Sequence, residues 1–267
     1  MAEMIMRGRR FWYLDTGEGV PVLALHGSFG RASVHEPLAE ILGPGYRLLA
    51  LDQRGHGLSA HGGPFDREAF VEDAAVFIEQ FGPAIVYGHS LGGVNAYQLA
   101  ARRPELVRAL IIQDIGAVTD RPVVEQPVLD ISGWPKLTRT REEFAEFFAN
   151  TPAPEYFMAS VVQTAEGWRT LYDYDDMMAV QHGNVGTWWG DWLGSACPAL
   201  LLHGSESFML PAAHAQEMLK RPNTELVEFP GSGHWLHDDD PARFASAVRT
   251  FVNGLRPDGE SSPPANE

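Results

Sequence analysis

The sequence is poor in cysteine and contains no long hydrophobic run. Cys197 is the single cysteine among 267 residues, which excludes an internal disulfide and favours a reducing compartment. A membrane-spanning helix needs about 18 consecutive apolar residues, and the sequence has no such run. Residues 1–7 also lack the apolar stretch of a signal peptide. We therefore expect a cytoplasmic protein that does not associate with a membrane.

Positive charge is also scarce. The chain has 20 Lys and Arg against 35 Asp and Glu, which gives a formal net charge of −15. Nucleic acid binding needs clustered Lys and Arg to neutralise phosphates, so this class of partner is excluded. A small-molecule substrate is the partner that we expect, and the composition leaves a homo-oligomer open.

Short apolar segments recur along the chain, with helix-like segments between them. Most of the later ones are apolar at consecutive positions, which is typical of strands that are covered on both faces. This alternation predicts an α/β protein with a mainly parallel sheet. Asp66 is placed to cap one of the intervening helices. The strand candidates are residues 10–14, 22–26, 47–51, 84–87, 107–113, 199–203 and 225–229.

The alternation stops between about residues 117 and 196. No strand is evident there, and the segment is rich in aromatic residues, with helix-like periodicity over 142–150, 155–164 and 171–181. We predict a helical cap at 117–196, inserted into a core domain made of residues 1–116 and 197–256. Residues 257–267 are polar and contain three prolines, so we predict a disordered tail there.

The most informative motif is Gly88-His89-Ser90-Leu91-Gly92. It follows the apolar segment 84–87 and opens a helix-like stretch. A sharp turn between strand and helix lifts a serine hydroxyl off the sheet edge, and the helix N-terminus beneath it favours developing negative charge. Side chains at the two glycine positions would crowd such a turn. The arrangement predicts that Ser90 is a nucleophile.

A nucleophilic serine needs an adjacent base, which is oriented in turn by a third group. His234 lies in a glycine-rich segment directly after the last strand candidate. A residue at this place can reach the carboxyl edge of the sheet, where Ser90 is expected. His234 is therefore the candidate general base, and His89 is interpreted as a structural residue.

Four sequence blocks occur in the order and spacing of the α/β-hydrolase superfamily, and the chain resembles that family over nearly all of its length outside the cap. The resemblance implies the α/β-hydrolase fold, with a mainly parallel eight-stranded sheet, helices on both faces and an inserted helical cap. It implies Ser90 as nucleophile and His234 as general base. It also implies an oxyanion hole formed by the backbone N–H groups of Ser28 and Leu91, with Phe29 as the less favoured second donor. The blocks are His26-Gly27-Ser28-Phe29, the structural loop Asp52–Ser59, Gly88-His89-Ser90-Leu91-Gly92, and Gly231-Ser232-Gly233-His234.

The acid of the triad departs from the commonest pattern of the family. Ser207 stands where many relatives carry an aspartate. Asp114 ends an earlier strand candidate, at a place where some members of the superfamily carry their acid, and Glu206 lies one position away from the usual site. We favour Asp114 and keep Glu206 as the alternative. The acid would hold His234 in the productive tautomer and stabilise its cation.

Aromatic residues gather in the cap and in loops expected at the same sheet edge. We expect Phe29, Trp188, Trp189, Phe208 and Met209 to line a largely apolar pocket. The leading hypothesis is a serine hydrolase, resembling carboxylesterases and lactonases, that cleaves an ester or lactone of a small, largely apolar substrate through an acyl-serine intermediate.

Two alternatives stay open. The chain could hydrolyse a carbon–carbon bond of a diketone-like metabolite with the same triad, or act as a non-catalytic ligand receptor on the same fold. A serine at position 90 argues against the aspartate-nucleophile dehalogenases and epoxide hydrolases of the superfamily. The sequence has neither a His-Glu-x-x-His cluster nor a Gly-x-Gly-x-x-Gly loop after a strand, so we expect no metal and no cofactor.

Overall fold

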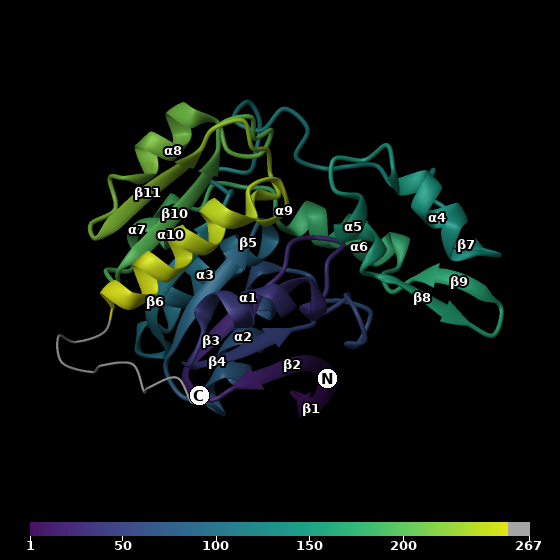
Figure 1. The fold of residues 1–267 in the computed structure, drawn as a ribbon, viewed down its shortest axis with the longest axis horizontal. Coiled ribbons are helices and arrows are strands. Elements are labelled where there is room, and N and C mark those ends of the chain that lie inside the picture. The colour runs from purple at the N-terminus through teal and green to yellow at the C-terminus, as the bar shows by residue number, and fades with distance from the viewer. Residues whose placement is uncertain (256–267) are drawn as a thin grey trace.

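The computed structural model describes residues 1–255, so the predicted tail at 257–267 lies outside the described residues. Within this range, eight strands form the central sheet in the order β1-β2-β4-β3-β5-β6-β10-β11. The pairs β1–β2 and β2–β4 are antiparallel, and the other neighbours are parallel. The strands are β1 (Ala2–Met6), β2 (Arg9–Gly17), β3 (Gly19–Leu25), β4 (Gly45–Leu51), β5 (Ala84–His89), β6 (Val107–Gln113), β10 (Ala199–Gly204) and β11 (Thr224–Phe229), as Figure 1 shows.

Helices cover both faces of this sheet (Figure 1). In β3, Leu23 and Leu25 belong to one hydrophobic cluster, and Val22 and Ala24 to the cluster on the opposite face. Burial on both faces explains why the strand is apolar at consecutive positions. One cluster contains residues of α1 (Glu36–Leu42) and α10 (Pro241–Gly254), and the other residues of α2 (Arg67–Glu79), α3 (Leu91–Arg102), α7 (Trp189–Leu193) and α8 (Ala212–Met218). The mainly parallel α/β sheet expected from the sequence is thereby confirmed.

Two acidic side chains stabilise local structure in the core. Asp66 caps α2, because its carboxylate accepts a hydrogen bond from the Ala69 N–H at 2.8 Å. Asp52 follows β4 and accepts from the N–H groups of Ala32 (2.6 Å) and Leu58 (2.8 Å). These bonds tie two loops together beside the sheet. A short helix, α9 (Leu236–Asp239), and two 3-10 helices, Ala32–His35 and Pro104–Leu106, complete the core.

Within the segment between β6 and β10, residues 137–183 project away from the sheet, and they are not all helical (Figure 1). They contain a small antiparallel sheet in the order β7-β9-β8, so the expectation that no strand occurs there was wrong. Residues 155–164, expected to be one helix, divide between α5 and β8. Strand β8 is only four residues long, which is too short for a strand pattern to stand out against helical periodicity. The elements are β7 (Leu137–Thr138), α4 (Arg141–Phe148), α5 (Pro154–Met158), β8 (Val161–Thr164), β9 (Gly167–Thr170) and α6 (Tyr174–Gly183).

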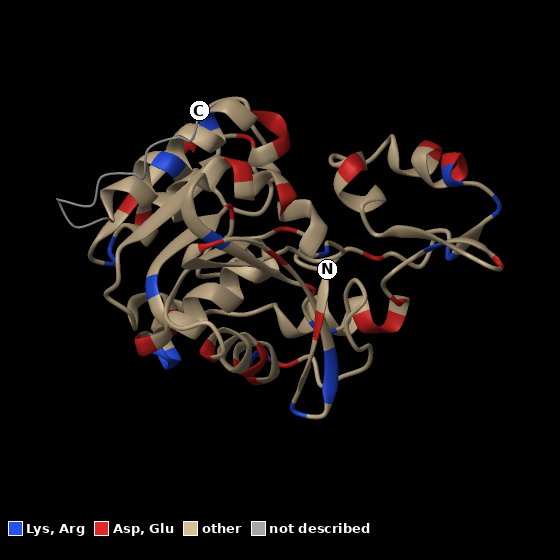
Figure 2. Cartoon of the chain, turned by 60° about the horizontal axis from the view of Figure 1, so that its bottom comes forward, with Lys and Arg blue, Asp and Glu red and all other residues tan. Residues whose placement is uncertain are grey.

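Acidic residues are spread over both the core and the cap, and Figure 2 shows fewer basic segments between them. The end of the small cap sheet is an exception, because Lys136, Arg139 and Arg169 are exposed there. No helix within residues 1–255 combines the length and the apolarity needed to cross a bilayer.

Candidate active site

Ser90 occupies the sharp turn between β5 and α3, with φ 53° and ψ −118°. Positive φ is strained for a residue with a side chain, so the surroundings must enforce it. A Cβ at position 88 would lie 2.2 Å from the carbonyl oxygen of Gly92, and a Cβ at position 92 would lie 2.0 Å from that of Leu25. The Ser90 N–H donates to the carbonyl of Gln113 at 3.1 Å. The two glycines therefore allow the close packing that holds the serine in this turn.

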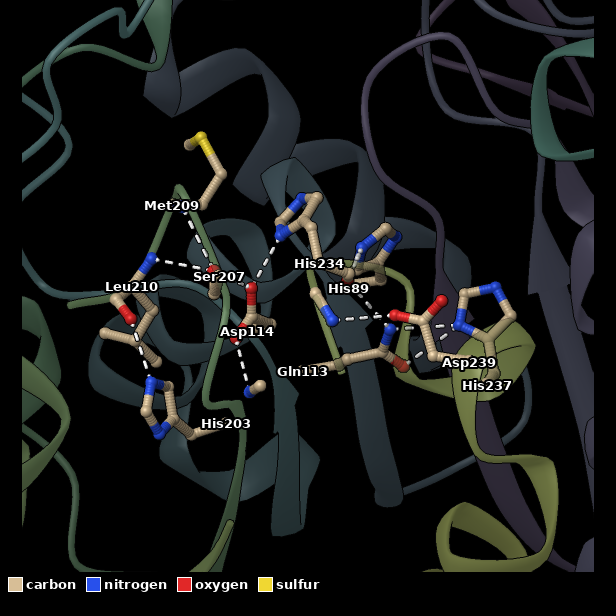
Figure 3. Close-up of polar contacts among 12 residues, drawn as sticks. His89, Gln113, Asp114, His203, Ser207, Met209, Leu210, His234, His237 and Asp239 are labelled. Carbon is tan, nitrogen blue, oxygen red and sulfur yellow. Dashed lines mark hydrogen bonds and ion pairs between the residues drawn. The ribbon is translucent and has the colours of Figure 1, made fainter. Parts of the chain in front are cut away.

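Asp114 and His234 are joined by a hydrogen bond between Oδ2 and Nδ1 at 2.7 Å (Figure 3). Asp114 follows β6 directly and is fully buried, and His234 comes from the loop after β11. An ionised carboxylate can only accept, so the proton of this bond lies on Nδ1. In the neutral ring Nε2 is then free of a proton, which is the tautomer that a base for a serine hydroxyl requires.

Ser207 binds the same oxygen of this carboxylate as His234 does (Figure 3). Its hydroxyl donates to Oδ2 of Asp114, while Oδ1 accepts from the N–H of Gly204 at 3.0 Å. The Ser207 oxygen accepts in turn from the N–H groups of Met209 (3.0 Å) and Leu210 (3.1 Å). Because the Ser207 oxygen accepts these two hydrogen bonds, its hydroxyl proton is directed to Asp114. The serine found where an acid was expected therefore positions the acid of the neighbouring strand.

The alternative acid, Glu206, has a different environment. It is exposed, and its backbone N–H donates to the carbonyl of Ser232 at 2.9 Å. Among the contacts of the described residues, the carboxylate bonded to His234 is that of Asp114. The geometry thus favours Asp114 for the role that the sequence left between two candidates.

Two side chains form hydrogen bonds with the backbone of His234 (Figure 3). Its carbonyl oxygen accepts from Nε2 of His89 at 3.1 Å and from Nε2 of Gln113 at 3.4 Å. The Gln113 amide also donates to Nδ1 of His237 at 2.9 Å. Burial lowers the pKa of His89 well below its ordinary value, so this ring is neutral at pH 7. His89 and Gln113 therefore position the loop of His234 without adding charge.

The two expected oxyanion donors both lie close to Ser90. Leu91 is the first residue of α3, so its N–H has no acceptor within the helix. Ser28 lies in the tight turn closed by the bond from the Gly30 N–H to the Gly27 carbonyl, at 3.2 Å. A Cβ on Gly27 would lie 3.1 Å from the Cβ of Ser90, so this turn passes directly beside the serine. The arrangement can present two N–H groups to a developing oxyanion.

A cavity of about 110 Å³ contains both Ser90 and His234 in its lining. Its walls come from the core loops and from the cap, and within the described range they include no Lys or Arg. Three of the expected pocket residues, Phe29, Phe208 and Met209, are among them. The lining residues are Gly27, Ser28, Phe29, His89, Ser90, Gln126, Pro127, Leu129, Tyr156, Phe157, Gln181, Asn184, Phe208, Met209, His234 and Trp235.

Trp188 and Trp189, which were also expected in the pocket, do not line this cavity. The Trp188 indole N–H donates to Oγ1 of Thr119 at 3.2 Å. The Trp189 ring packs against His214, with ring centroids 5.2 Å apart. Both side chains pack against the large hydrophobic cluster on the α3 face of the sheet. Helix α7 runs along this face, so the tryptophans contribute to the core and not to the substrate wall.

Several cap residues in the cavity lining were not predicted. Tyr156 and Phe157 on α5 and Gln181 on α6 face the catalytic residues across the interface between core and cap. Their only signal in the sequence is the aromatic richness of the cap, which does not say which ring faces the site. No group of three or more His, Cys, Asp or Glu within residues 1–255 is arranged to hold a metal ion.

Comparison with known proteins identifies the family of the chain. The chain matches the model of the alpha/beta hydrolase family over residues 22–247. It is 26% identical over 258 residues to the sn-1-specific diacylglycerol lipase ABHD11 of Mus musculus, covering 90% of this chain and 83% of that protein. It is 27% identical over 260 residues to the 2-(acetamidomethylene)succinate hydrolase of Mesorhizobium japonicum, covering 90% of each. A crystal structure of E-2-(acetamidomethylene)succinate hydrolase matches with a TM-score of 0.87 and 23% identity, over 94% of this chain and 98% of that one. The chain belongs to the alpha/beta hydrolase family.

Proposed function

We propose that the protein is a serine hydrolase that cleaves an ester or lactone of a small, uncharged substrate through an acyl-serine intermediate. The observation that carries the proposal is the hydrogen-bonded pair of Asp114 and His234, whose imidazole lines the same cavity as Ser90. Two relatives support ester chemistry. One is named as a diacylglycerol lipase, and the other, from Haemophilus influenzae and 25% identical, is named as a putative esterase/lipase.

The reaction follows from the positions of these groups. Oγ of Ser90 attacks the substrate carbonyl while Nε2 of His234 takes the hydroxyl proton. The carbonyl oxygen becomes an oxyanion, which the N–H groups of Ser28 and Leu91 stabilise. Each such donor contributes about 3 kcal/mol to the transition state. His234 then returns its proton to the leaving oxygen, and a water molecule, deprotonated by the same imidazole, hydrolyses the acyl-serine.

The cavity wall favours neutral substrates. Its lining combines aromatic and aliphatic side chains with amide groups, and it contains no Lys or Arg among the described residues. The substrate in the name of the Mesorhizobium relative is a succinate derivative, whose carboxylates need cationic partners when they are buried. This pocket does not supply such partners. A volume of about 110 Å³ is also below the range of about 300–1,000 Å³ that is common for ligand pockets, so short acyl groups should fit best.

A fluorophosphonate probe tests the nucleophile. We expect covalent labelling of the wild-type protein and none of Ser90→Ala, since the probe reacts only with an activated serine. Ser132→Ala is the control, because it changes an exposed serine and should label normally. Asn95→Ala would not serve as a control, because Asn95 is part of a buried hydrogen-bond network. A wild-type protein that folds but resists the probe would favour the ligand receptor.

A series of p-nitrophenyl esters tests the substrate class. We expect kcat/KM to fall from acetate and butyrate to octanoate, and to fall further for a hemisuccinate that places a carboxylate in the cavity. A preference for the charged ester would contradict the neutral-substrate proposal. Hydrolysis of a diketone without any turnover of esters would favour carbon–carbon bond cleavage instead.

A further inference from the structure

A second cavity, of about 340 Å³, lies between the core and the cap. Its walls come from the 3-10 helix Ala32–His35, from α1, α9 and the start of α10, and from α5 of the cap. Among the described residues, Tyr156 alone lines both this cavity and the catalytic one. The tyrosine therefore separates a space large enough for a small organic ligand from the site of Ser90.

The charged residues of this cavity are all acidic. Glu36, Glu155 and Asp238 line it and are exposed, so they form its mouth, and its described lining contains no Lys or Arg. Partial burial raises the pKa of Asp238, and the like charges of Asp239 and Glu155 raise it further, whereas a protonated His237 would lower it. Burial also lowers the pKa of His237, so this ring supplies no positive charge at pH 7. A cation at the mouth would relieve the repulsion between these carboxylates.

The interior of the cavity is aromatic and carries an unsatisfied polar atom. Tyr87 and Phe244 line it and are buried. His35 is 4% exposed, and its Nε2 has no hydrogen-bond partner among the described residues. The hydroxyl of Tyr156 points the other way, because it lies against Gly27 and Gly30 in the turn beside Ser90. Burial lowers the pKa of His35 to about 3, so its neutral ring can accept a hydrogen bond without repelling a cation. Leaving such an atom unpaired costs about 1–3 kcal/mol.

We propose that this cavity binds a small amino alcohol. The ammonium group would lie between the carboxylates of the mouth and the rings of Tyr87, Tyr156 and Phe244, whose faces attract a cation. The hydroxyl group would supply the partner that His35 lacks. No residue of the catalytic triad lines this cavity, so the site is separate from the hydrolase chemistry.

Isothermal titration with choline, compared with its neutral isostere 3,3-dimethylbutan-1-ol, tests the proposal. The two compounds share shape and hydroxyl group and differ in charge. A carboxylate at about 6 Å from a cation in a water-like dielectric changes affinity about threefold, so three of them should favour choline by tenfold or more. In Glu155→Gln/Asp238→Asn we expect choline to bind about tenfold more weakly and the neutral compound to bind as before. The unchanged neutral affinity would show that the cavity is intact.

Two further variants locate the site. Ala159→Leu adds bulk to the cavity wall and should weaken both compounds. Glu142→Gln/Glu146→Gln removes two charges from the exposed side of α4 and should leave choline binding unchanged. Choline should not compete with p-nitrophenyl acetate, because Tyr156 stands between the cavities. Any one of four results would overturn the proposal. These are absence of choline binding, equal affinity for choline and its isostere, no effect of the Glu155→Gln/Asp238→Asn change on choline binding, and competition between choline and the ester.

Discussion

Replacement of Asp114 by asparagine is the sharpest test of the catalytic geometry. The side chain keeps its shape in a fully buried position, but an amide group now faces His234 in place of a carboxylate. Where the amide N–H points at Nδ1, that nitrogen must accept, and the imidazole proton moves to Nε2. The ring can then no longer take the proton of Ser90.

We expect a large loss of kcat in the Asp114→Asn variant. In the serine protease triad the same replacement lowers kcat about 10⁴-fold, because the wrong tautomer is held in otherwise intact geometry. A loss of 10³–10⁴-fold corresponds to about 4–5 kcal/mol of transition-state stabilisation. The bond of 2.7 Å between Asp114 and His234 leaves no room for water to take over the role of the carboxylate. KM should change little, because Asp114 does not line the catalytic cavity.

The assay is the steady-state hydrolysis of p-nitrophenyl acetate, with thermal unfolding to verify that each variant is folded. Glu206→Gln is the matched control, since it neutralises an exposed carboxylate in the adjacent loop. Its kcat should stay within about twofold of wild type, as is usual for surface charges. A folded Asp114→Asn protein that keeps more than about a tenth of the wild-type kcat would refute the assignment. An equal loss in Glu206→Gln would transfer the role of acid to Glu206.

Three further perturbations test other parts of the structure. Ser207→Ala removes one hydrogen bond to a charged acceptor and should lower kcat about tenfold or more, whereas Ser207→Thr keeps the hydroxyl and should recover most of the activity. Gly88→Ala should prevent stable folding in urea titrations, because its Cβ would lie 2.2 Å from the Gly92 carbonyl oxygen, whereas Gly133→Ala meets open space and should be tolerated. Burial lowers the pKa of His35 to about 3 in the folded protein. As the pH falls below about 6.5, this imidazole is therefore protonated in the unfolded chain but not in the folded one, which favours unfolding. The wild type should lose about 2 kcal/mol of stability through this group between pH 7 and pH 5, and His35→Gln should lack that part of the loss.

The main elements of the core could be predicted because their physical signals are local. Strand β6 covers the predicted residues 107–113, and β5, β10 and β11 extend their candidates by one or two residues. Strand β1 was missed, since it lies at the edge of the sheet and alternates between half-buried and exposed positions over only five residues. The cap strands were missed because they are two to four residues long and lie among aromatic residues that also fit a helix.

The pocket was harder to predict than the turn of the nucleophile. Phe208 and Met209 follow a strand whose carboxyl end points to the site, so their place along the chain indicates their place in space. Trp188 and Trp189 are as aromatic as the rings that line the cavity, yet they pack against the hydrophobic cluster on the α3 face of the sheet. Composition shows that a segment is apolar but does not show which surface it covers.

The sequence by itself determined the order of the core strands along the chain, the glycine-flanked turn that exposes Ser90, and the loop that carries His234. These features depend on residues close together in the chain, whose backbone preferences and packing operate over a few positions. Only the tertiary structure brought Asp114, rather than Glu206, against the imidazole and placed Tyr156 between two cavities. Both outcomes depend on the direction in which side chains leave neighbouring strands and helices, and that direction is decided when the sheet and the cap pack together.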